Sequence, residues 1–287
     1  RYGDYLGICV KIPYQLVAAV SKEHRHQQMA KALERGFPRI QPVSIEDGKS
    51  ISIACYGPSL GDTWNEITRP IISVSGALHY LAERGIVPDY HVEMDPRPHK
   101  VRHIDPPVDG VHYIMASVCS SKTWEILKGH KVTLVHVYSA AGTKEWIEQN
   151  DPGQIMLRPG STSGMAAIHI GGLLGYRHFE IHGMDGCLRD GNRHAGAHFG
   201  HPQGGITWQA GHKIYDTSQI MANACAEVIN SFRIYPIFGV FHGDGLQQAL
   251  VEEEYGLDNV ARSCTPKAEM VRKARYRLVS VFQEAEA

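Results

Sequence analysis

The sequence lacks a long apolar run and an excess of charge of one sign. No stretch of about 18 residues is continuously apolar, and no charged segment followed by an apolar one stands at the N-terminus. We therefore expect a cytoplasmic protein without a membrane partner. The 29 basic and 30 acidic side chains nearly cancel, so the charge indicates neither a nucleic-acid groove nor a basic surface that binds membranes.

Cysteine pairs with metal-ligand spacing are also missing. The chain has six cysteines and no C-x-x-C motif among them: Cys9, Cys55, Cys119, Cys187, Cys225 and Cys264. This scattered spacing disfavours a zinc knuckle or a disulfide framework and fits a reducing compartment. We expect core residues or free thiols at these positions, and we expect no metal site.

The sequence does contain a regular alternation of short apolar strands and helices. With 287 residues, of which 43% are hydrophobic, the chain can build one large core or two small ones. Strands are predicted at residues 50–55, 71–76, 89–95, 111–117, 131–138 and 178–185, and helices at residues 77–85, 121–129, 141–149 and 164–175. This pattern predicts an α/β fold with a Rossmann-like, mostly parallel sheet and helices on both faces.

Further elements are expected towards both ends of the chain. Helices are predicted at residues 14–35, 216–232 and 267–287, a last strand at 233–240, and a long loop at 188–212. Asp216 or Thr217 is the expected N-cap of the helix at 216–232. The expected division is an N-terminal helical extension over residues 1–48, a main domain over 49–250 and a C-terminal helical segment over 251–287. The predicted terminal helices could pack on the core or between subunits, so the sequence leaves open whether the chain forms a homo-oligomer.

Two of the predicted strands end in residues that a ligand could reach. In open parallel sheets, ligands bind beyond the carboxyl ends of the strands, where helix N-termini attract anions. After the first strand, Gly57 and Pro58 predict a sharp turn, and Ser59 can cap a helix or donate to a phosphate. Asp95 ends the third strand and is a candidate hydroxyl acceptor or metal ligand. Both features also occur as plain turns in proteins that bind nothing there.

A third loop reads GSTSG and combines glycines, hydroxyls and backbone N–H groups at the start of a helix. Its residues are Gly160, Ser161, Thr162, Ser163 and Gly164. This composition favours an anion-binding nest. The loop lacks the lysine of a P-loop and the G-x-G-x-x-G spacing of dinucleotide-binding folds. Because the next helix is rich in alanine and glycine, we expect it to pack closely on the sheet and to hold a phosphorylated ligand at its N-terminus.

Several of the 17 histidines gather in the predicted long loop: His194, His198, His201 and His212. The H-x-x-x-H spacing of the first two would bind zinc only on a helix, and the surrounding glycines argue against a helix. A general base or a phosphate partner is the better interpretation of this group. His212 follows Gly211 just ahead of a predicted helix, and we expect its imidazole to face the cleft.

In their order and spacing, the segments CYGPSL, GALHYLAERGIVPDYHVEMDP and GSTSGMAAIHIGGLLGYRHFEIHGMD resemble a known family. This family comprises the bacterial motility accessory factors (Maf) and the 6-hydroxymethylpterin pyrophosphokinase MptE-like proteins. The resemblance covers roughly residues 51–249 and implies a nucleotide-binding catalytic domain. More distantly, the chain is similar to bacterial sialyltransferases that use CMP-sialic acid. They share the G-P-S-L turn, the T-S-G start of a helix and a G-[IM]-D strand end.

The sialyltransferase resemblance implies which residues contact a nucleotide. In that family the turn and the T-S-G loop surround the cytidine nucleotide, which implies the same contacts for Gly57, Pro58, Ser59, Thr162, Ser163 and Gly164. Tyr56 stands where that family has an asparagine, so the donor need be neither CMP-activated nor a sialic acid.

The same resemblance implies catalytic roles. A base histidine that follows a glycine there corresponds to His212 here. Two tyrosines that hold the leaving phosphate there fall near Cys187 and near Arg193 or His194, so Arg193 and His194 would replace them. His198 is a secondary candidate.

We therefore expect a glycosyltransferase that moves a sugar from a nucleotide-activated donor, with a CMP-linked sugar among the candidates. Asp95 and Asp185 would bind ribose or sugar hydroxyls, Arg193 or His194 would stabilise the departing phosphate, and His212 would act as general base. The acceptor is left open among a protein, a glycan, a modified nucleic-acid base and a small molecule. No cofactor is expected.

Two alternatives remain from the sequence. The first is a pyrophosphokinase that uses ATP, with Mg²⁺ held by Asp95 and Asp185. The second is a module that binds a nucleotide without catalysis.

Overall fold

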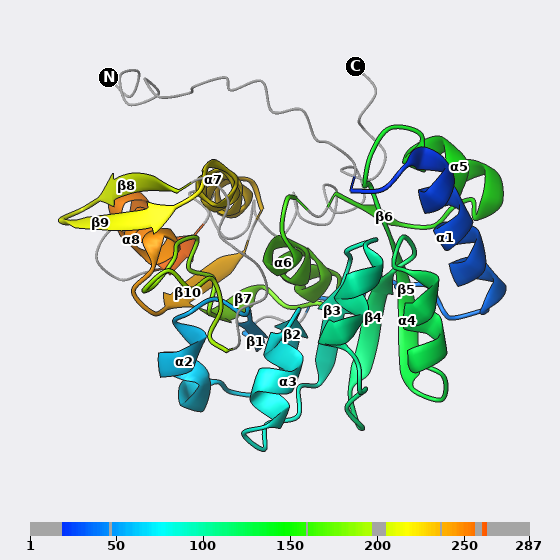
Figure 1. Cartoon of the computed structure of the whole chain (residues 1–287), viewed down its shortest axis with the longest axis horizontal. Coiled ribbons are helices and arrows are strands. Elements are labelled where there is room, and N and C mark those ends of the chain that lie inside the picture. Colours follow the sequence, from blue (N-terminus) through cyan, green and yellow to red (C-terminus); the bar gives the residue numbers. More distant parts are fainter. Residues whose placement is uncertain are drawn as a thin grey trace.

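A computed structural model describes residues 19–45, 48–158, 160–196, 205–235, 237–255 and 260–262. In these residues a nine-stranded sheet has the order β11-β10-β7-β1-β2-β3-β4-β5-β6 (Figure 1). Its strands are β1 (Ser50–Ala54), β2 (Ile71–Val74), β3 (Tyr90–Glu93), β4 (His112–Ala116), β5 (Lys131–Val137), β6 (Met156–Leu157), β7 (His178–His182), β10 (Phe238–His242) and β11 (Val260–Arg262). Every neighbouring pair is parallel except β10 with β11. The predicted Rossmann-like α/β fold is confirmed.

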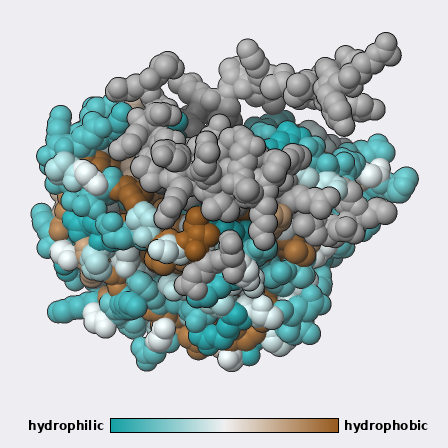
Figure 2. Space-filling model, turned by 180° about the vertical axis from the view of Figure 1, so that it is seen from behind, coloured by the Kyte–Doolittle hydropathy of each residue, from teal (hydrophilic) through white to brown (hydrophobic). Residues whose placement is uncertain are grey.

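The helices in the described ranges follow the predicted alternation. They are α1 (Lys22–Glu34), α2 (Leu60–Thr63), α3 (Ala77–Ala82), α4 (Ser121–Ile126), α5 (Thr143–Asn150), α6 (Ser163–Leu173), α7 (Gln219–Ile234) and α8 (Leu246–Tyr255), with two short 3₁₀ helices, η1 (Trp64–Glu66) and η2 (Pro98–His103). None of these helices is long and apolar enough to span a membrane. On the face shown in Figure 2, hydrophilic residues cover most of the surface that the described residues form, and hydrophobic residues form small separate groups.

Both faces of the sheet are covered by helices. Successive side chains of a strand point to opposite faces, and the residues of β2 divide accordingly between two buried clusters. Ile72 lies in the larger cluster, which includes the buried side of α6, whereas Ile71 packs with Leu60 of α2 and Leu81 of α3. The sheet is therefore buried on both sides, which is why its strands read as continuous apolar runs.

Helix α6 lies very close to the sheet, as its alanine and glycine content predicted. A Cβ on Gly171 would stand 2.6 Å from Cε1 of Phe179, and a Cβ on Gly164 would stand 2.9 Å from Sγ of Cys55. Larger residues at these positions would push the helix outward. The close approach places the N-terminus of α6 directly at the carboxyl edge of the sheet.

The strand order reverses at β1. From β1 the chain adds β2 to β6 on one side, and it then returns to place β7 and β10 on the other side. The loops that follow β1 and β7 therefore leave in different directions from neighbouring strands, and such a switch point is where open α/β sheets bind ligands.

The structure corrects several expectations for the second half of the chain. The predicted long loop contains β8 (Ile206–Ala210), which forms an antiparallel hairpin with β9 (Lys213–Thr217) just after the loop. Most residues of this hairpin are exposed on both faces, so it shows no apolar alternation. Ser218 caps α7, instead of Asp216 or Thr217.

Two further boundaries differ from the predicted ones. Helix α7 runs through Ile234, and β10 begins only at Phe238, so the strand predicted at 233–240 is shifted. Pairing with β7 sets this start, because Phe238 is in register with His178. The expected domain boundary at residue 250 falls inside α8. Residues 14–18 and 267–287, where helical structure was predicted, lie outside the described residues.

Candidate functional site

Two cavities open along the carboxyl edge of the sheet. The Asp185 pocket, of about 250 Å³, is formed by the segments that follow β1, β2 and β7, by the start of α6 and by part of α7. The Asp95 pocket, of about 620 Å³, is formed by the segments that follow β3, β5 and β6, and by parts of α1, α6 and α7. Thr162 and Ser163 line both, so the two cavities meet at the start of α6.

The predicted site residues divide between these cavities. The Asp185 pocket is lined by Gly57, Pro58, Thr162, Ser163, Gly164, Asp185, Arg193 and His194, among others. Asp95 and Ser161 line the Asp95 pocket. Ser59 and His212 line neither cavity, and His198 lies outside the described residues.

The turn after β1 is held in place by the loop after β7. The backbone N–H of Ser59 donates to Oδ2 of Asp185 at 2.9 Å, and the N–H of Gly57 donates to the carbonyl oxygen of Gly183 at 2.8 Å. A Cβ on Gly57 would stand 2.3 Å from Oδ2 of Asp185 and 2.4 Å from the carbonyl oxygen of Gly183. Only glycine allows the two loops to approach this closely.

One carboxylate oxygen of Asp185 accepts a hydrogen bond from the backbone, and the other has no partner among the described residues. The residue is 3% exposed, and burial raises the pKa of its carboxyl group above the ordinary value. Its Oδ1 makes no hydrogen bond to any described residue. An unpaired buried acceptor is unfavourable, so a ligand hydroxyl that reached Oδ1 would gain a strong, charge-assisted hydrogen bond.

Among the described residues, His194 is the histidine that lines the Asp185 pocket. Its Nδ1 lies 3.2 Å from the carbonyl oxygen of Tyr56, and its ring stacks on the Tyr56 ring with centroids 4.9 Å apart. Burial lowers the pKa of His194 to about 4, so the imidazole is neutral at pH 7. Because a carbonyl oxygen can only accept, Nδ1 carries the proton and Nε2 keeps a lone pair.

Arg193 and Ser75 add two features to the same pocket. The Nε of Arg193 is buried and makes no hydrogen bond to the described residues. Ser75 follows β2 with a φ of 51°, a left-handed conformation that is rare for residues other than glycine. Such backbone strain gathers at binding sites. Sequence reasoning missed Ser75, because a serine gives no sign of a positive φ.

Buried thiols form part of the wall of the Asp185 pocket. Cys55, Cys187 and Cys225 line it, and all three are free. Burial raises the thiol pKa to about 12 for Cys55 and to about 11 for Cys187. Since a protonated thiol is a poor nucleophile, these cysteines serve as lining. The expectation of buried free thiols is confirmed for them and for Cys119.

Two hydrogen bonds fix the loop where it enters α6. Oγ1 of Thr162 accepts the N–H of Met165 at 3.2 Å, which caps the helix. The N–H of Ser161 donates to Oε2 of Glu227 on α7 at 2.9 Å. Glu227 lies 66 residues further along the chain, so no local pattern in the sequence could connect it to this loop.

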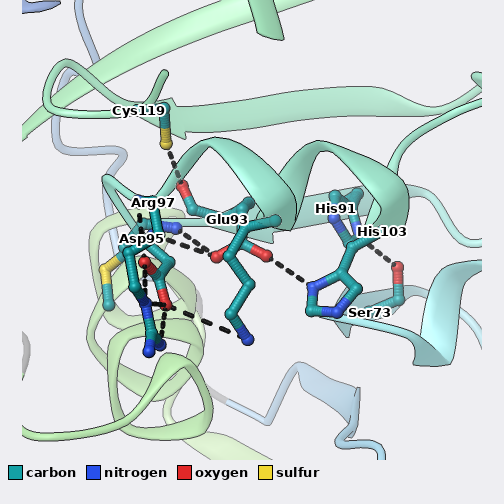
Figure 3. A network of polar contacts seen from close by, with 9 residues as sticks. Ser73, His91, Glu93, Asp95, Arg97, His103 and Cys119 are labelled. Carbon is teal, nitrogen blue, oxygen red and sulfur yellow. Dashed lines mark hydrogen bonds and ion pairs between the residues drawn. The ribbon is translucent and has the colours of Figure 1, made fainter. Parts of the chain in front are cut away.

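Asp95 is held by basic neighbours on its own segment. Its Oδ1 accepts hydrogen bonds from the backbone N–H and the Nε of Arg97, both at 2.9 Å, and Nζ of Lys100 lies 3.9 Å from Oδ2 (Figure 3). Burial opposes ionisation, yet the hydrogen bonds and charge of Arg97 hold the pKa of Asp95 below its ordinary value. Asp95 is therefore a carboxylate whose charge the protein already neutralises.

A buried network behind Asp95 fixes the end of β3. Oε1 of Glu93 accepts the backbone N–H groups of Met94 and Asp95 at 2.8 and 3.0 Å, and Oε2 lies 3.0 Å from Nδ1 of His103. The thiol of Cys119 donates to the carbonyl oxygen of Glu93 at 3.3 Å. In Figure 3, Glu93 lies between His103 and the pair of Asp95 with Arg97. The network holds the backbone that carries Asp95.

Three expected roles are changed by this geometry. The side chain of Ser59 is fully buried and lines neither cavity, and its backbone N–H donates to Asp185. His212 stands in the exposed turn between β8 and β9, and a strand separates it from α7. Asp95 and Asp185 line different pockets. The described ranges contain no group of three or more side chains suited to hold a metal ion.

Comparisons with known proteins agree with the resemblance inferred from the motifs. A family profile described as "6-hydroxymethylpterin diphosphokinase MptE-like" matches residues 24–191, more than half of the chain. The solved structure of a Maf glycosyltransferase from Magnetospirillum magneticum AMB-1 is similar with a TM-score of 0.58 at 14% identity. The likeness covers 96% of this chain and 45% of that one, and at this identity it shows the fold alone. No curated protein matches the sequence.

Proposed function

Because the chain belongs to the 6-hydroxymethylpterin diphosphokinase MptE-like family, we propose that it is a transferase that binds a nucleotide in the Asp185 pocket, and that it transfers a sugar from a nucleotide-activated donor. One observation carries the proposal. The turn at Gly57, the N-terminus of α6 and the unpaired Oδ1 of Asp185 meet in one cavity at the switch point of the sheet. The fold that the chain shares with a Maf glycosyltransferase supports this choice of reaction.

The lining of the pocket offers complementary groups for a nucleotide. Backbone N–H groups at the start of α6 favour a phosphate through the helix dipole, and Arg193 can add a positive charge to the same cavity. Asp185 would accept a hydroxyl of the ribose or the sugar. Asp95, which lines the neighbouring cavity, is proposed to reach a hydroxyl of the transferred sugar.

The geometry supports His194 as the acid–base residue. In the proposed step the acceptor hydroxyl passes its proton to Nε2 of His194 while its oxygen forms the new bond to the anomeric carbon. The bond from that carbon to the phosphate oxygen breaks, and the nucleotide leaves with the electron pair. A bound phosphate would raise the low pKa of His194 towards neutrality, and Arg193 would stabilise the charge on the leaving group. His212, which the resemblance implies, is the alternative base.

A transfer assay with matched histidine variants decides between these residues. We expect His194→Gln to lower kcat by about 10² to 10⁴, the usual range for loss of a general base. We expect His212→Ala and the exposed control His24→Gln to keep near-normal kcat. A fall in kcat in His212→Ala alone would indicate that His212, on the hairpin, is the base. It would contradict the role proposed for His194.

A binding screen tests the nucleotide itself. Melting temperatures are measured with CMP, CDP, UDP, GDP and ATP, each with and without Mg²⁺, because a ligand that binds the folded state raises them. Stabilisation by a nucleoside mono- or diphosphate without metal is the expected result.

The family description favours a second candidate, a diphosphokinase acting on a hydroxymethylpterin. Stabilisation only by ATP with Mg²⁺, together with loss of activity in EDTA, would establish that alternative. Nucleotide binding without turnover of any acceptor would instead indicate a module without catalysis.

A further inference from the structure

Arg25 is a buried arginine whose charge has no carboxylate partner among the residues that the structure describes. It lies on α1, is 3% exposed and lines the Asp95 pocket. Its guanidinium donates to two backbone carbonyl oxygens, those of Val20 and Ala141, each at 3.0 Å. Its Nε makes no hydrogen bond to a described residue. Burying an arginine in this way is unfavourable unless an anion completes its surroundings.

A second arginine faces the same cavity. Arg158 follows β6, is exposed, and stands over the ring of Tyr138 with its guanidinium carbon 5.6 Å from the ring centroid. It forms no ion pair with a described residue. A planar guanidinium that is held but unpaired is well suited to bind carboxylate or phosphate oxygens.

The acidic groups of the cavity are already engaged. Asp95 is bonded to Arg97 and lies close to Lys100, and Glu227 accepts the N–H of Ser161. The start of α6, an 11-residue helix, adds the positive end of its dipole at Thr162. Arg25, Arg158 and the helix dipole therefore offer positive charge that forms no ion pair with Asp95 or Glu227 among the described residues.

We propose that the Asp95 pocket binds the acceptor of the transfer reaction, and that this acceptor is a small molecule with a carboxylate or phosphate group held by Arg25 and Arg158. This inference rests on the proposed function, since the start of α6 is where a donor in one pocket and an acceptor in the other would meet. A volume of about 620 Å³ is within the range of small-molecule sites. The pocket thus favours a small anionic acceptor over a folded protein.

The test measures anion binding by the whole chain with two probes, inorganic phosphate and malonate, by isothermal titration. We expect Arg158→Gln to weaken binding at least tenfold and Arg25→Gln to do the same. The probe that binds more tightly identifies the acceptor group. Arg69→Gln is the matched control, because Arg69 is exposed, lines neither pocket and is paired with Asp89; its affinity should stay within twofold of the unaltered chain.

Arg25 is buried, so its removal can also lower stability. Arg25→Lys keeps the charge, and circular dichroism checks the fold of each variant. We expect Arg25→Lys to retain more anion affinity than Arg25→Gln. Unchanged binding in Arg158→Gln and in folded Arg25→Gln would overturn the proposal, as would an equal loss in Arg69→Gln. Loss in Arg193→Gln alone would place the anion in the Asp185 pocket and would also overturn it.

A separate readout distinguishes this inference from the proposed function. Nucleotide binding should depend on Asp185, and anion binding should not, so Asp185→Asn is titrated with both kinds of ligand. If nucleotides bind but the arginine variants leave anion affinity unchanged, the acceptor site alone is wrong. If no nucleotide binds while anion affinity follows Arg25 and Arg158, the anion site stands and the proposed function fails.

Discussion

The carboxylate of Asp185 accepts the backbone N–H of Ser59 at 2.9 Å, although the two residues are 126 positions apart in the chain. This bond joins the turn after β1 to the loop after β7 and shapes the wall of the Asp185 pocket. It also leaves the other oxygen of Asp185 unpaired. One carboxylate thus links the fold of the switch point to the proposed binding of a nucleotide.

Gly57→Ala tests how closely these loops must approach. The added Cβ would stand 2.3 Å from Oδ2 of Asp185, so either the turn or the carboxylate has to move. We expect the unfolding free energy to fall by about 1–3 kcal/mol, as in other overpacked sites, and nucleotide affinity to fall at least tenfold. The control is Gly61→Ala, where the nearest atom to the new Cβ is 3.7 Å away. Equal effects in both variants would contradict the argument.

Asp185→Asn should separate binding from stability. Asparagine still accepts the N–H of Ser59, but it removes a carboxylate whose pKa is raised by burial. A raised pKa means that the folded state binds the proton more tightly, so Asp185 lowers stability as pH rises through its folded-state pKa. We expect the melting temperature of Asp185→Asn at pH 7 to equal or exceed that of the unaltered chain.

The same variant should bind nucleotide about 10- to 100-fold more weakly, because a hydrogen bond to a charged group is worth about 1.5–3 kcal/mol. Calorimetry measures stability, and titration with the best nucleotide from the screen measures affinity. A large loss of stability at pH 7 with unchanged nucleotide affinity would show that the carboxylate serves the fold only.

Buried neutral histidines predict a loss of stability in acid. Burial lowers the pKa to about 4 for His169 and to about 3 for His91. Because the unfolded chain binds these protons more readily, the stability that these residues contribute is present above about pH 6.5 and is lost as pH falls towards 4. For each such histidine, we expect the unfolding free energy to drop by up to roughly 1.4 kcal/mol per pH unit in that window.

Urea unfolding at pH 7 and pH 5 measures this dependence. In His169→Phe the unfolding free energy should depend less on pH than in the unaltered chain. In His24→Gln, an exposed control, the dependence should not change. A curve for His169→Phe that is as steep as that of the unaltered chain would remove His169 from the explanation.

Ser117, His136 and Asp151 have the residue types of a hydrolase triad but, on this structure, only a structural role. Oγ of Ser117 lies 2.8 Å from Nδ1 of His136, whose Nε2 lies 2.9 Å from Oδ2 of Asp151. Nε of Arg39 donates to the same Oδ2 at 2.7 Å. Ser117 is fully buried and lines neither pocket.

We expect a fluorophosphonate probe not to label Ser117, and Ser117→Ala to retain transferase activity. Asp151→Asn should lower the unfolding free energy by about 1 kcal/mol, because it weakens two partly buried polar contacts. Asp109→Asn, at an exposed position, is the control. Labelling that disappears in Ser117→Ala would show that the serine is reached by ligands after all.

The sequence by itself determined the strand and helix alternation, the sharp turn at Gly57 and the start of a helix after the hydroxyl-rich loop at Gly160 to Ser163. These features depend on local physics: side-chain periodicity, glycine's freedom to approach another backbone, and a hydroxyl that bonds an N–H three residues on. The same local patterns gave the family resemblance, which the profile match and the fold bear out. For that reason several residues that line the Asp185 pocket were predicted, such as Gly57, Thr162 and Asp185, whereas Ser75 and those on α7 were not.

Only the tertiary structure decided which loops share a cavity. Because β7 pairs with β1, Asp185 lies within hydrogen-bond distance of Ser59. Asp95 follows β3 and lines a different pocket. His194, already a candidate from the sequence, lines the Asp185 pocket, whereas His212 lies on the hairpin of β8 and β9. No motif predicted Arg25 on α1 or Glu227 on α7. Both helices are far in the sequence from the loop before α6, one on each side of it. Contacts of this kind depend on the order of strands and the packing of helices across the whole sheet, and no local pattern encodes that order.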